Sequence, residues 1–206
     1  MNPLRILLAD DHAIVRIGLT SLLESETDMT VVGQAKNGAE AVQFARRLKP
    51  DIVIMDLMMP KMDGVTATAV LARELPETKI IVLTSYGASD DVAHALEAGA
   101  AGAIMKTAED AALIGAIRKI AAGEKVISAE IRKLLSDNPP VPRLTPRQRD
   151  VLASITRGLT NREIAVELGI RHDGVDRHVN AILAKIGAAN RAEAVAIALR
   201  KQLLKI

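Results

Sequence analysis

Short, uninterrupted apolar runs alternate with longer amphipathic stretches between residues 4 and 122. The runs lie at Arg5–Leu8, Thr30–Gly33, Ile52–Met55, Ile80–Leu83 and Ala103–Met105. Continuous apolar runs are typical of strands that are covered on both faces, as in a parallel sheet. The stretches between them have helical periodicity and lie at Ala13–Leu23, Gly38–Leu48, Val65–Leu75, Asp91–Ala98 and Glu109–Ala122. The pattern predicts a doubly wound α/β domain with a five-stranded parallel sheet, whose ligands bind at the carboxyl ends of the strands.

Residues 143–206 carry helical patterns only. Thr145–Gln148 and Thr160–Glu163 match capping boxes, which mark the first turn of a helix. Gly158, Gly169 and Gly187 stand where helices are expected to end. We expect a small all-α domain of four helices, near residues 146–157, 161–168, 173–186 and 190–204.

A proline-rich segment separates the two parts. A short helix is compatible with Ala129–Leu135, and residues 137–142 then contain three prolines in four positions. Such a sequence sustains neither a helix nor a central strand and favours a semi-extended linker. We therefore expect a first domain at 1–123, a linker at 124–142 and a second domain at 143–206.

The charge is divided unevenly along the chain. The 206 residues carry 27 Lys or Arg and 25 Asp or Glu, a net charge of +2. Residues 1–128 have a net charge of −4 and residues 129–206 a net charge of +6. A basic second domain indicates a polyanionic partner. Phe44 and Tyr86 are the only aromatic residues, so recognition of single-stranded nucleic acid by base stacking is excluded.

The sequence contains no cysteine, which excludes disulfides, thiolate zinc sites and a thiol nucleophile. It suits a reducing compartment, and we expect a cytoplasmic protein. Apolar stretches are far shorter than the ~20 residues of a membrane span, and no signal peptide is visible, so no membrane association is expected.

Polar residues follow the predicted strands. Asp10 and Asp11 follow the first strand, Asp56 ends the third, Thr84 ends the fourth and Lys106 follows the fifth. At one sheet edge, two carboxylates ~4 Å apart would repel by about 4 kcal/mol at an effective dielectric near 20. A hard cation such as Mg²⁺ removes that repulsion. A carboxylate beside a lysine, a hydroxyl and a metal is equipped to accept a phosphoryl group.

These residues, in their context, resemble the receiver domain of bacterial two-component response regulators over about residues 4–122. The matching motifs are Asp10-Asp11-His12, residues 56–64, Leu83-Thr84-Ser85 and Met105-Lys106. For any single aspartate among them, an ordinary loop or helix-cap role is the favoured interpretation. All five positions together favour the receiver, and the resemblance implies a flavodoxin-like fold.

The resemblance also implies the role of each residue. Asp56 would be phosphorylated by a sensor histidine kinase, and Thr84 and Lys106 would contact the phosphoryl group. Asp10, Asp11, Asp56 and the main-chain carbonyl of Met58 would bind Mg²⁺.

One position departs from the receiver pattern. Three residues before the lysine, the family usually has a Tyr or Phe that moves inward on activation, and this chain has Ala103. The usual coupling between the hydroxyl and the aromatic ring is therefore not expected. Tyr86 could substitute in part, although an exposed loop position is the simpler interpretation.

The third C-terminal helix has two distinct faces. Val175, Val179, Ile182, Leu183 and Ile186 gather on one face and predict the buried side. Arginine and asparagine residues occupy the opposite face, and a short helix precedes it, as in a helix-turn-helix that presents its second helix to the major groove. We expect DNA contacts from Thr160, Asn161, Arg171, Arg177, His178, Asn180 and Lys185.

This part resembles the LuxR-type DNA-binding domain, through residues 144–148, 158–165 and 190–194 and the apolar positions of the third helix. A receiver followed by this domain is the layout of the NarL/FixJ group. The reading helix departs from that group, because Gly174-Val175-Asp176 replaces Thr-Val-Lys. The Asp176 carboxylate would repel phosphate, and a role at the positive helix N-terminus is favoured over base reading.

The last helix leaves a choice open. Val195, Leu199 and Leu203 are expected to face inward, with Ile197 and Leu204 on the outer side. Two exposed apolar residues of this kind are ordinary, or they form a seam of the homodimer that the resemblance implies.

We expect a phosphorylation-controlled, DNA-binding transcriptional regulator whose partners are a sensor histidine kinase, double-stranded DNA and a second copy of the chain. The alternative is a DNA-binding or adaptor protein that uses the receiver fold without phosphorylation, as Ala103 and Asp176 suggest. A phosphatase of the haloacid-dehalogenase kind needs an Asp two residues after its nucleophile, where Met58 stands. An autonomous enzyme is therefore not expected.

Overall fold

The computed structural model describes residues 2–85, 89–140, 144–201 and 203–204. The chain divides into two compact units, Met1–Pro140 and Val141–Ile206. Each unit has its own buried apolar cluster, and each is described by itself below.

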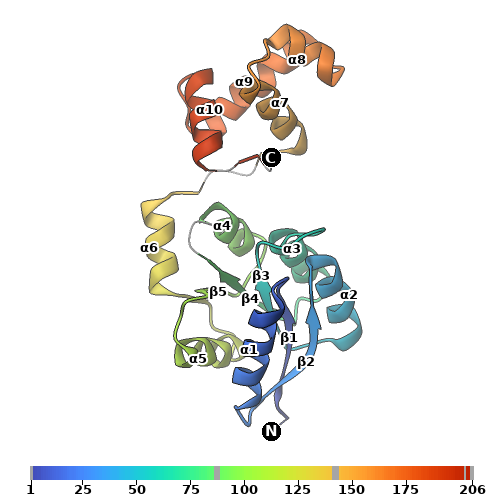
Figure 1. Ribbon diagram of the computed structural model, residues 1–206, viewed down its shortest axis with the longest axis vertical. Helices are drawn as coiled ribbons and strands as arrows, with labels where there is room; N and C mark the ends of the chain where they lie inside the picture. Colours follow the sequence, from blue (N-terminus) through green and yellow to red (C-terminus); the bar gives the residue numbers. More distant parts are fainter. Residues whose placement is uncertain (1, 86–88, 141–143, 202, 205–206) are drawn as a thin grey trace. The chain divides into compact units, whose positions relative to one another are not determined.

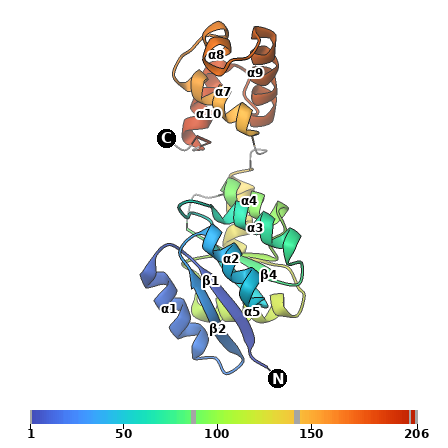
Figure 2. The same ribbon diagram turned by 90° about the vertical axis from the view of Figure 1, so that its right-hand side faces the viewer.

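The first unit is built on a parallel sheet (Figures 1 and 2). Its strand order is β2-β1-β3-β4-β5-β6, and every neighbouring pair is parallel. The strands are β1 (Leu4–Ala9), β2 (Met29–Ala35), β3 (Ile52–Asp56), β4 (Lys79–Thr84), β5 (Gly102–Met105) and β6 (Val126–Ile127). The predicted α/β class and the five predicted strands are confirmed. The sixth strand, only two residues long, was not predicted.

Helices cover both faces of the sheet (Figures 1 and 2). Helices α1 (Ala13–Glu24) and α5 (Asp110–Ala121) share one buried cluster with residues of β1, β3, β4 and β5. Helices α2 (Gly38–Leu48) and α3 (Gly64–Glu74) share the cluster on the other face. Helix α4 (Ser89–Glu97) joins a third cluster beside β4 and β5. Coverage on both faces explains why the strands are continuously apolar.

Most of the segment expected as a linker, residues 124–142, is folded into the first unit. β6 pairs with β5, and α6 (Ala129–Asp137) follows directly after Ser128, whose hydroxyl accepts from the amide of Ile131. Ile131 is fully buried. The sequence pattern allowed the helix but gave no sign of its packing. The last two residues of the expected linker, Val141 and Pro142, lie outside the described residues.

The described residues of the second unit form four helices, as predicted. They are α7 (Pro146–Thr156), α8 (Asn161–Leu168), α9 (His172–Ile186) and α10 (Arg191–Arg200). Thr145 and Thr160 close the two predicted capping boxes, and Gly169 and Gly187 end α8 and α9 in the left-handed conformation. The apolar face predicted for α9 lies in the core of the unit, where Val175 and Ile182 are fully buried.

The orientation predicted for the last helix is only partly right, because Val195 and Leu203 pack against the core of the unit but Leu199 does not. Ile197, expected on the outer face, is buried together with Ala194 and Ala198, whereas Leu199 is exposed. Leu204 also packs against the core of this unit. The proposed seam of Ile197 and Leu204 is therefore not available at the surface. Among the described residues, no helix combines the length and apolar character that a membrane crossing requires.

Candidate functional site

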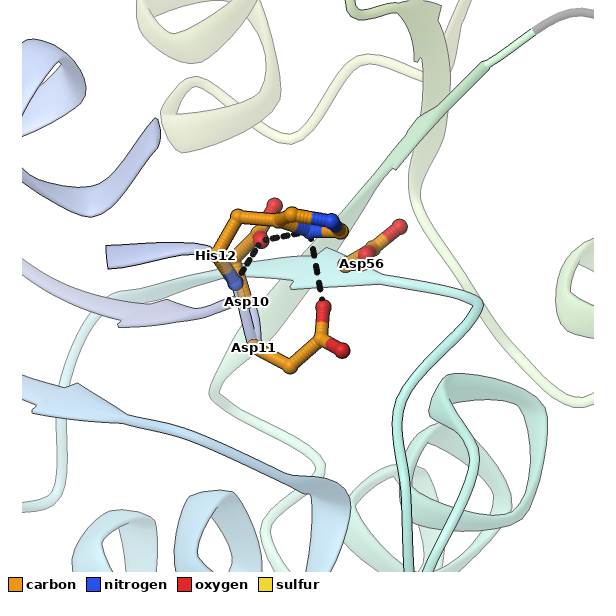
Figure 3. A group of neighbouring side chains, drawn as sticks. All are labelled: Asp10, Asp11, His12 and Asp56. Atoms are coloured by element: carbon orange, nitrogen blue, oxygen red, sulfur yellow. Dashed lines mark hydrogen bonds and ion pairs between the residues drawn. The ribbon is translucent and has the colours of Figure 1, made fainter. Parts of the chain in front are cut away.

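The carboxyl ends of β1 and β3 bring three aspartates together, as the sequence predicted (Figure 3). Asp10 and Asp11 follow β1, and Asp56 is the last residue of β3. One potential ligand atom from each, together with one from His12, lies within 4.8 Å of the others. Asp10 and Asp56 are buried, and Asp11 is exposed.

Lys106 inserts its ammonium group between two of these carboxylates. Its Nζ lies 2.6 Å from Oδ2 of Asp10 and 2.9 Å from Oδ2 of Asp56. Burial disfavours the charged ammonium, but the hydrogen bonds to Asp10 and Asp56 outweigh that effect and raise the pKa of Lys106. The lysine therefore stays charged and partly neutralises the acidic cluster.

The surroundings of Asp56, in contrast, disfavour the charged form of its side chain. Burial raises the pKa of the Asp56 carboxyl, and the neighbouring charge of Asp10 adds to the effect, although the contact with Lys106 opposes it. Its carboxylate is thus only partly compensated in the structure. A further positive charge beside Asp56 and Asp10 would stabilise both anions.

Two further predicted residues lie at the same sheet edge. Thr84 ends β4 and is buried, and its hydroxyl donates to the carbonyl of Ser85. The main-chain amide of Lys106 donates to the Thr84 carbonyl over 2.8 Å, which ties the ends of β4 and β5 together. Met58, two residues after Asp56, is 58% exposed. Tyr86 lies outside the described residues.

The loop after Asp56 depends on a glycine. The amide of Gly64 donates to the Leu57 carbonyl, and a Cβ at Gly64 would lie 2.0 Å from the carbonyl oxygen of Asp56. No side chain larger than hydrogen fits there without moving the backbone of Asp56. The Asp-to-Gly motif therefore has a steric reason as well as a chemical one.

Two residues contact the cluster without having been assigned a role in it. His12 Nδ1 lies 2.9 Å from Asp11 Oδ1 and 3.2 Å from Asp10 Oδ1 (Figure 3). Arg16 is buried, and its Nη1 donates to the Asp10 carbonyl over 2.7 Å. The position of Arg16 one helical turn after His12 was the available signal, because a charged residue on a buried helix face needs a partner.

The donor set suits a hard divalent cation. Carboxylate oxygens from Asp10, Asp11 and Asp56 are the ligands that Mg²⁺ prefers in proteins. The burial of Asp56 beside a second buried carboxylate, that of Asp10, favours such an ion. Receiver domains generally bind Mg²⁺ in an acidic pocket, and this chain has the corresponding aspartate cluster.

The predicted DNA-contacting residues fall into two groups. Arg171, Arg177 and Asn180 are exposed at or on α9. Arg171 pairs with Asp173, and Nε of Arg177 donates to the Asp173 carbonyl. His178 is half-buried on the same helix. These side chains lie at or on the predicted reading helix.

The other predicted contacts are engaged inside the second unit. Asn161 donates to Asp176 over 2.7 Å and accepts from Arg191 over 2.9 Å. Lys185 donates to the side chain of Gln148, and the Thr160 hydroxyl caps α8. The role of Asp176 as a partner of Asn161 was missed, because the two residues are 15 positions apart in the sequence.

Comparisons with known proteins agree with this architecture. Residues 6–118 match the response regulator receiver domain, and residues 142–198 match the luxR family of bacterial regulatory proteins. The chain is 40% identical to the transcriptional regulatory protein LiaR of Bacillus subtilis, with 98% of this chain and 99% of LiaR covered. It is 36% identical to the response regulator protein VraR of Staphylococcus aureus, over 98% of this chain and 99% of VraR.

Solved structures of response regulators are also similar. ChrA, from a heme-sensing two-component system, matches with a TM-score of 0.61 and 33% identity, covering 99% of this chain and all of ChrA. RcsB from Salmonella enterica serovar Typhimurium, bound to a promoter in the presence of a phosphomimetic, has a TM-score of 0.68 and 25% identity over 98% of this chain and all of RcsB. The chain belongs to the response regulators that combine a receiver domain with a C-terminal domain of the luxR family.

Proposed function

We propose that this protein is a transcriptional regulator whose binding to double-stranded DNA is controlled by phosphorylation of Asp56. The juxtaposition of buried Asp56 with Asp10 and Lys106 carries the proposal. LiaR, named as a transcriptional regulatory protein, and RcsB, solved in complexes with DNA, support the output function. We assign the phosphoryl donor to a sensor histidine kinase in the cytoplasm, where the DNA also lies.

The chemistry requires a nucleophile and stabilisation of spreading charge. A carboxylate oxygen of Asp56 forms the bond to phosphorus, while the bond between phosphorus and the donor nitrogen of the kinase histidine breaks. Lys106, already 2.9 Å from Asp56, neutralises the phosphoryl oxygens. Asp10, Asp11, Asp56 and the main-chain carbonyl of Met58 would hold Mg²⁺, which supplies additional positive charge for the transfer.

Phosphorylation changes what Lys106 and Thr84 can bind. Their new partner is a dianionic group, and one or two charge-assisted hydrogen bonds of about 1.5–3 kcal/mol each shift a two-state equilibrium by roughly one to four decades. The Thr84 hydroxyl, which donates to the Ser85 carbonyl, would change its partner to reach the phosphoryl group.

The exposed residues of α9 support the DNA-binding half of the proposal. Arg177 and Asn180 are exposed on α9, and we assign base contacts to them and contacts with the DNA backbone to Arg171 and His178. Asn161, Thr160 and Lys185 already have partners within the unit, and we assign them a supporting role at the interface. RcsB has been solved as dimers on DNA, and we propose a homodimer for this chain as well.

A second candidate function is DNA binding or adaptor activity without phosphorylation. Ala103, in place of the expected aromatic residue, favours it, because one element of the usual switch is missing. The two functions differ in the response of the whole chain to acetyl phosphate and Mg²⁺. Mass spectrometry should find a phosphoryl adduct of Asp56 in the native chain and none in Asp56→Asn. An unmodified native chain would favour the second function.

A further inference from the structure

Helix α6 belongs to neither of the two segments that match known families. Those segments are residues 6–118 and 142–198. Nevertheless, α6 is part of the first unit and lies on the β5–β6 side of the sheet, in yellow in Figure 1. The amide of Ser128 donates to the Ala103 carbonyl over 3.0 Å, which fixes the start of α6 against β5.

Ile131 anchors this helix. It is the one buried residue of α6 and is 0% exposed. It packs in the cluster that contains Ala103 of β5 and Val92 and Ala95 of α4. Glu130, Arg132 and Lys133 are exposed, and Leu134 and Leu135 are partly buried against the same cluster, so Ile131 is the most deeply buried contact of the attachment.

Ala103 lies in the same buried cluster as Ile131. It is 0% exposed, and it stands where a receiver domain usually carries Tyr or Phe. A ring at this position would add a large side chain to that cluster, and overpacking of this kind displaces neighbouring side chains. The missing aromatic residue and the docked α6 are therefore two aspects of one packing arrangement.

The same cluster touches the phosphorylation site through chain neighbours. Leu57 follows Asp56 directly, and Met105 precedes Lys106; both belong to the cluster of Ile131. Val82, two residues before Thr84, belongs to it too. Inward movement of Thr84 or Lys106 toward a phosphoryl group thus disturbs the packing against which Ile131 rests.

The connection from α6 to the second unit is short in sequence and rich in proline. Residues 138–145 separate α6 from α7, and three of these eight residues are prolines. Proline-rich segments behave as semi-rigid spacers. Only eight residues lie between α6 and the first helix of the DNA-binding unit.

We propose that Ile131 is a positioning residue for the phosphorylation response: it holds α6 on α4 and β5 in the unphosphorylated chain, and phosphorylation of Asp56 weakens this attachment. In this chain Ile131 and Ala103 replace the aromatic switch. The inference rests on the proposed function, because it concerns how phosphorylation reaches the DNA-binding unit.

Hydrogen exchange on the full chain tests the attachment. With Mg²⁺ and beryllofluoride, a phosphoryl mimic, the amides of residues 133–137 should exchange on the order of tenfold faster than without beryllofluoride. Ile131→Ala should show fast exchange in both states, and Ile131→Val should behave like the native chain. Ala103→Tyr, which refills the space, should also release α6 without beryllofluoride. Native-like protection of α6 in Ala103→Tyr would overturn the proposal.

DNA titration provides the functional readout. In Ile131→Ala, the ratio of DNA affinities with and without beryllofluoride should fall toward one. The reason is that this variant, without beryllofluoride, should bind DNA more tightly than the native chain does. A purely structural role would weaken both forms equally. The control Lys133→Ala, on the exposed face of α6, should keep the native ratio.

The two proposals fail in distinguishable ways. If beryllofluoride does not change the DNA affinity of the native chain, the proposed control by phosphorylation is wrong, and so is the role of Ile131 in it. If the native chain responds and Ile131→Ala responds by the same factor, only the role of Ile131 is wrong.

Discussion

Lys106 Nζ lies 2.9 Å from Oδ2 of Asp56, between the carboxylate that we assign as phosphoryl acceptor and that of Asp10. The ammonium group therefore occupies the position from which it can neutralise both the resting cluster and a transferred phosphoryl group. Its contacts explain why two buried carboxylates coexist at this edge.

Removing this charge should destabilise the first unit. Lys106→Met leaves Asp10 and Asp56 facing each other without their shared partner, and we expect the unfolding free energy to fall by about 1.5–3 kcal/mol. Added Mg²⁺ should restore part of the loss, because it supplies the missing positive charge. Urea denaturation with and without Mg²⁺ measures both effects. Lys133→Met, at an exposed site, is the control, and an equal loss in both variants would refute the assignment.

The raised pKa of Asp56 predicts a pH dependence of stability. Between the ordinary carboxyl pKa of 3.8 and the raised folded pKa, the folded chain binds more protons than the unfolded chain. The contribution of Asp56 to stability therefore falls as pH rises through that window. Asp56→Asn should be more stable than the native chain at pH 7 without Mg²⁺, and the difference should shrink below pH 3.8. Thermal unfolding of both chains across this pH range, at constant ionic strength, measures the difference in stability. A difference that does not change with pH would contradict the prediction.

Gly64 should tolerate no side chain. Gly64→Ala places a Cβ against the Asp56 carbonyl, and we expect a cost of about 3 kcal/mol together with weaker Mg²⁺ binding. Gly18→Ala is the matched control, because Gly18 lies inside α1 with no atom within 4 Å of an added Cβ. It should stabilise the chain by about 0.5–1 kcal/mol through helix propensity. Calorimetry on both variants compares them, and native-like stability and Mg²⁺ affinity in Gly64→Ala would exclude a steric role.

Substitutions on α9 should separate base reading from internal support. Arg177→Ala should lose about 1–3 kcal/mol of binding free energy for target DNA and discriminate less well against scrambled DNA. Lys185→Ala should weaken both DNAs evenly, with a smaller effect because its ammonium already donates to Gln148. Fluorescence anisotropy at several salt concentrations gives the affinities and the salt slope. Arg46→Ala, in the first unit, is the control; if Arg177→Ala matched it on both DNAs, α9 would not be the reading helix.

The sequence correctly predicted the positions of residues whose place follows from the direction of the strands. The carboxyl ends of parallel strands meet at one edge, so Asp10, Asp56 and Lys106 could be placed together from their positions after the strands. Capping residues such as Thr145 and Thr160 fixed the helix starts, because their hydroxyls act within one turn.

The features that sequence reasoning missed depend on tertiary packing. The burial of Ile131 requires packing against residues of α4 and β5, elements that precede it by about 30 residues. The pairing of Asp176 with Asn161 joins two helices, and the inward face of α10 is lined largely by alanines, whose pattern is weak. Local periodicity does not encode such contacts.

The most direct test of the account compares DNA affinity before and after treatment with acetyl phosphate and Mg²⁺, for the native chain and for Asp56→Asn. We predict that the native chain binds target DNA at least tenfold more tightly after treatment, in line with the shift from one charge-assisted hydrogen bond, and that Asp56→Asn does not respond. Equal affinities of the native chain before and after treatment, or the same increase in Asp56→Asn, would contradict it.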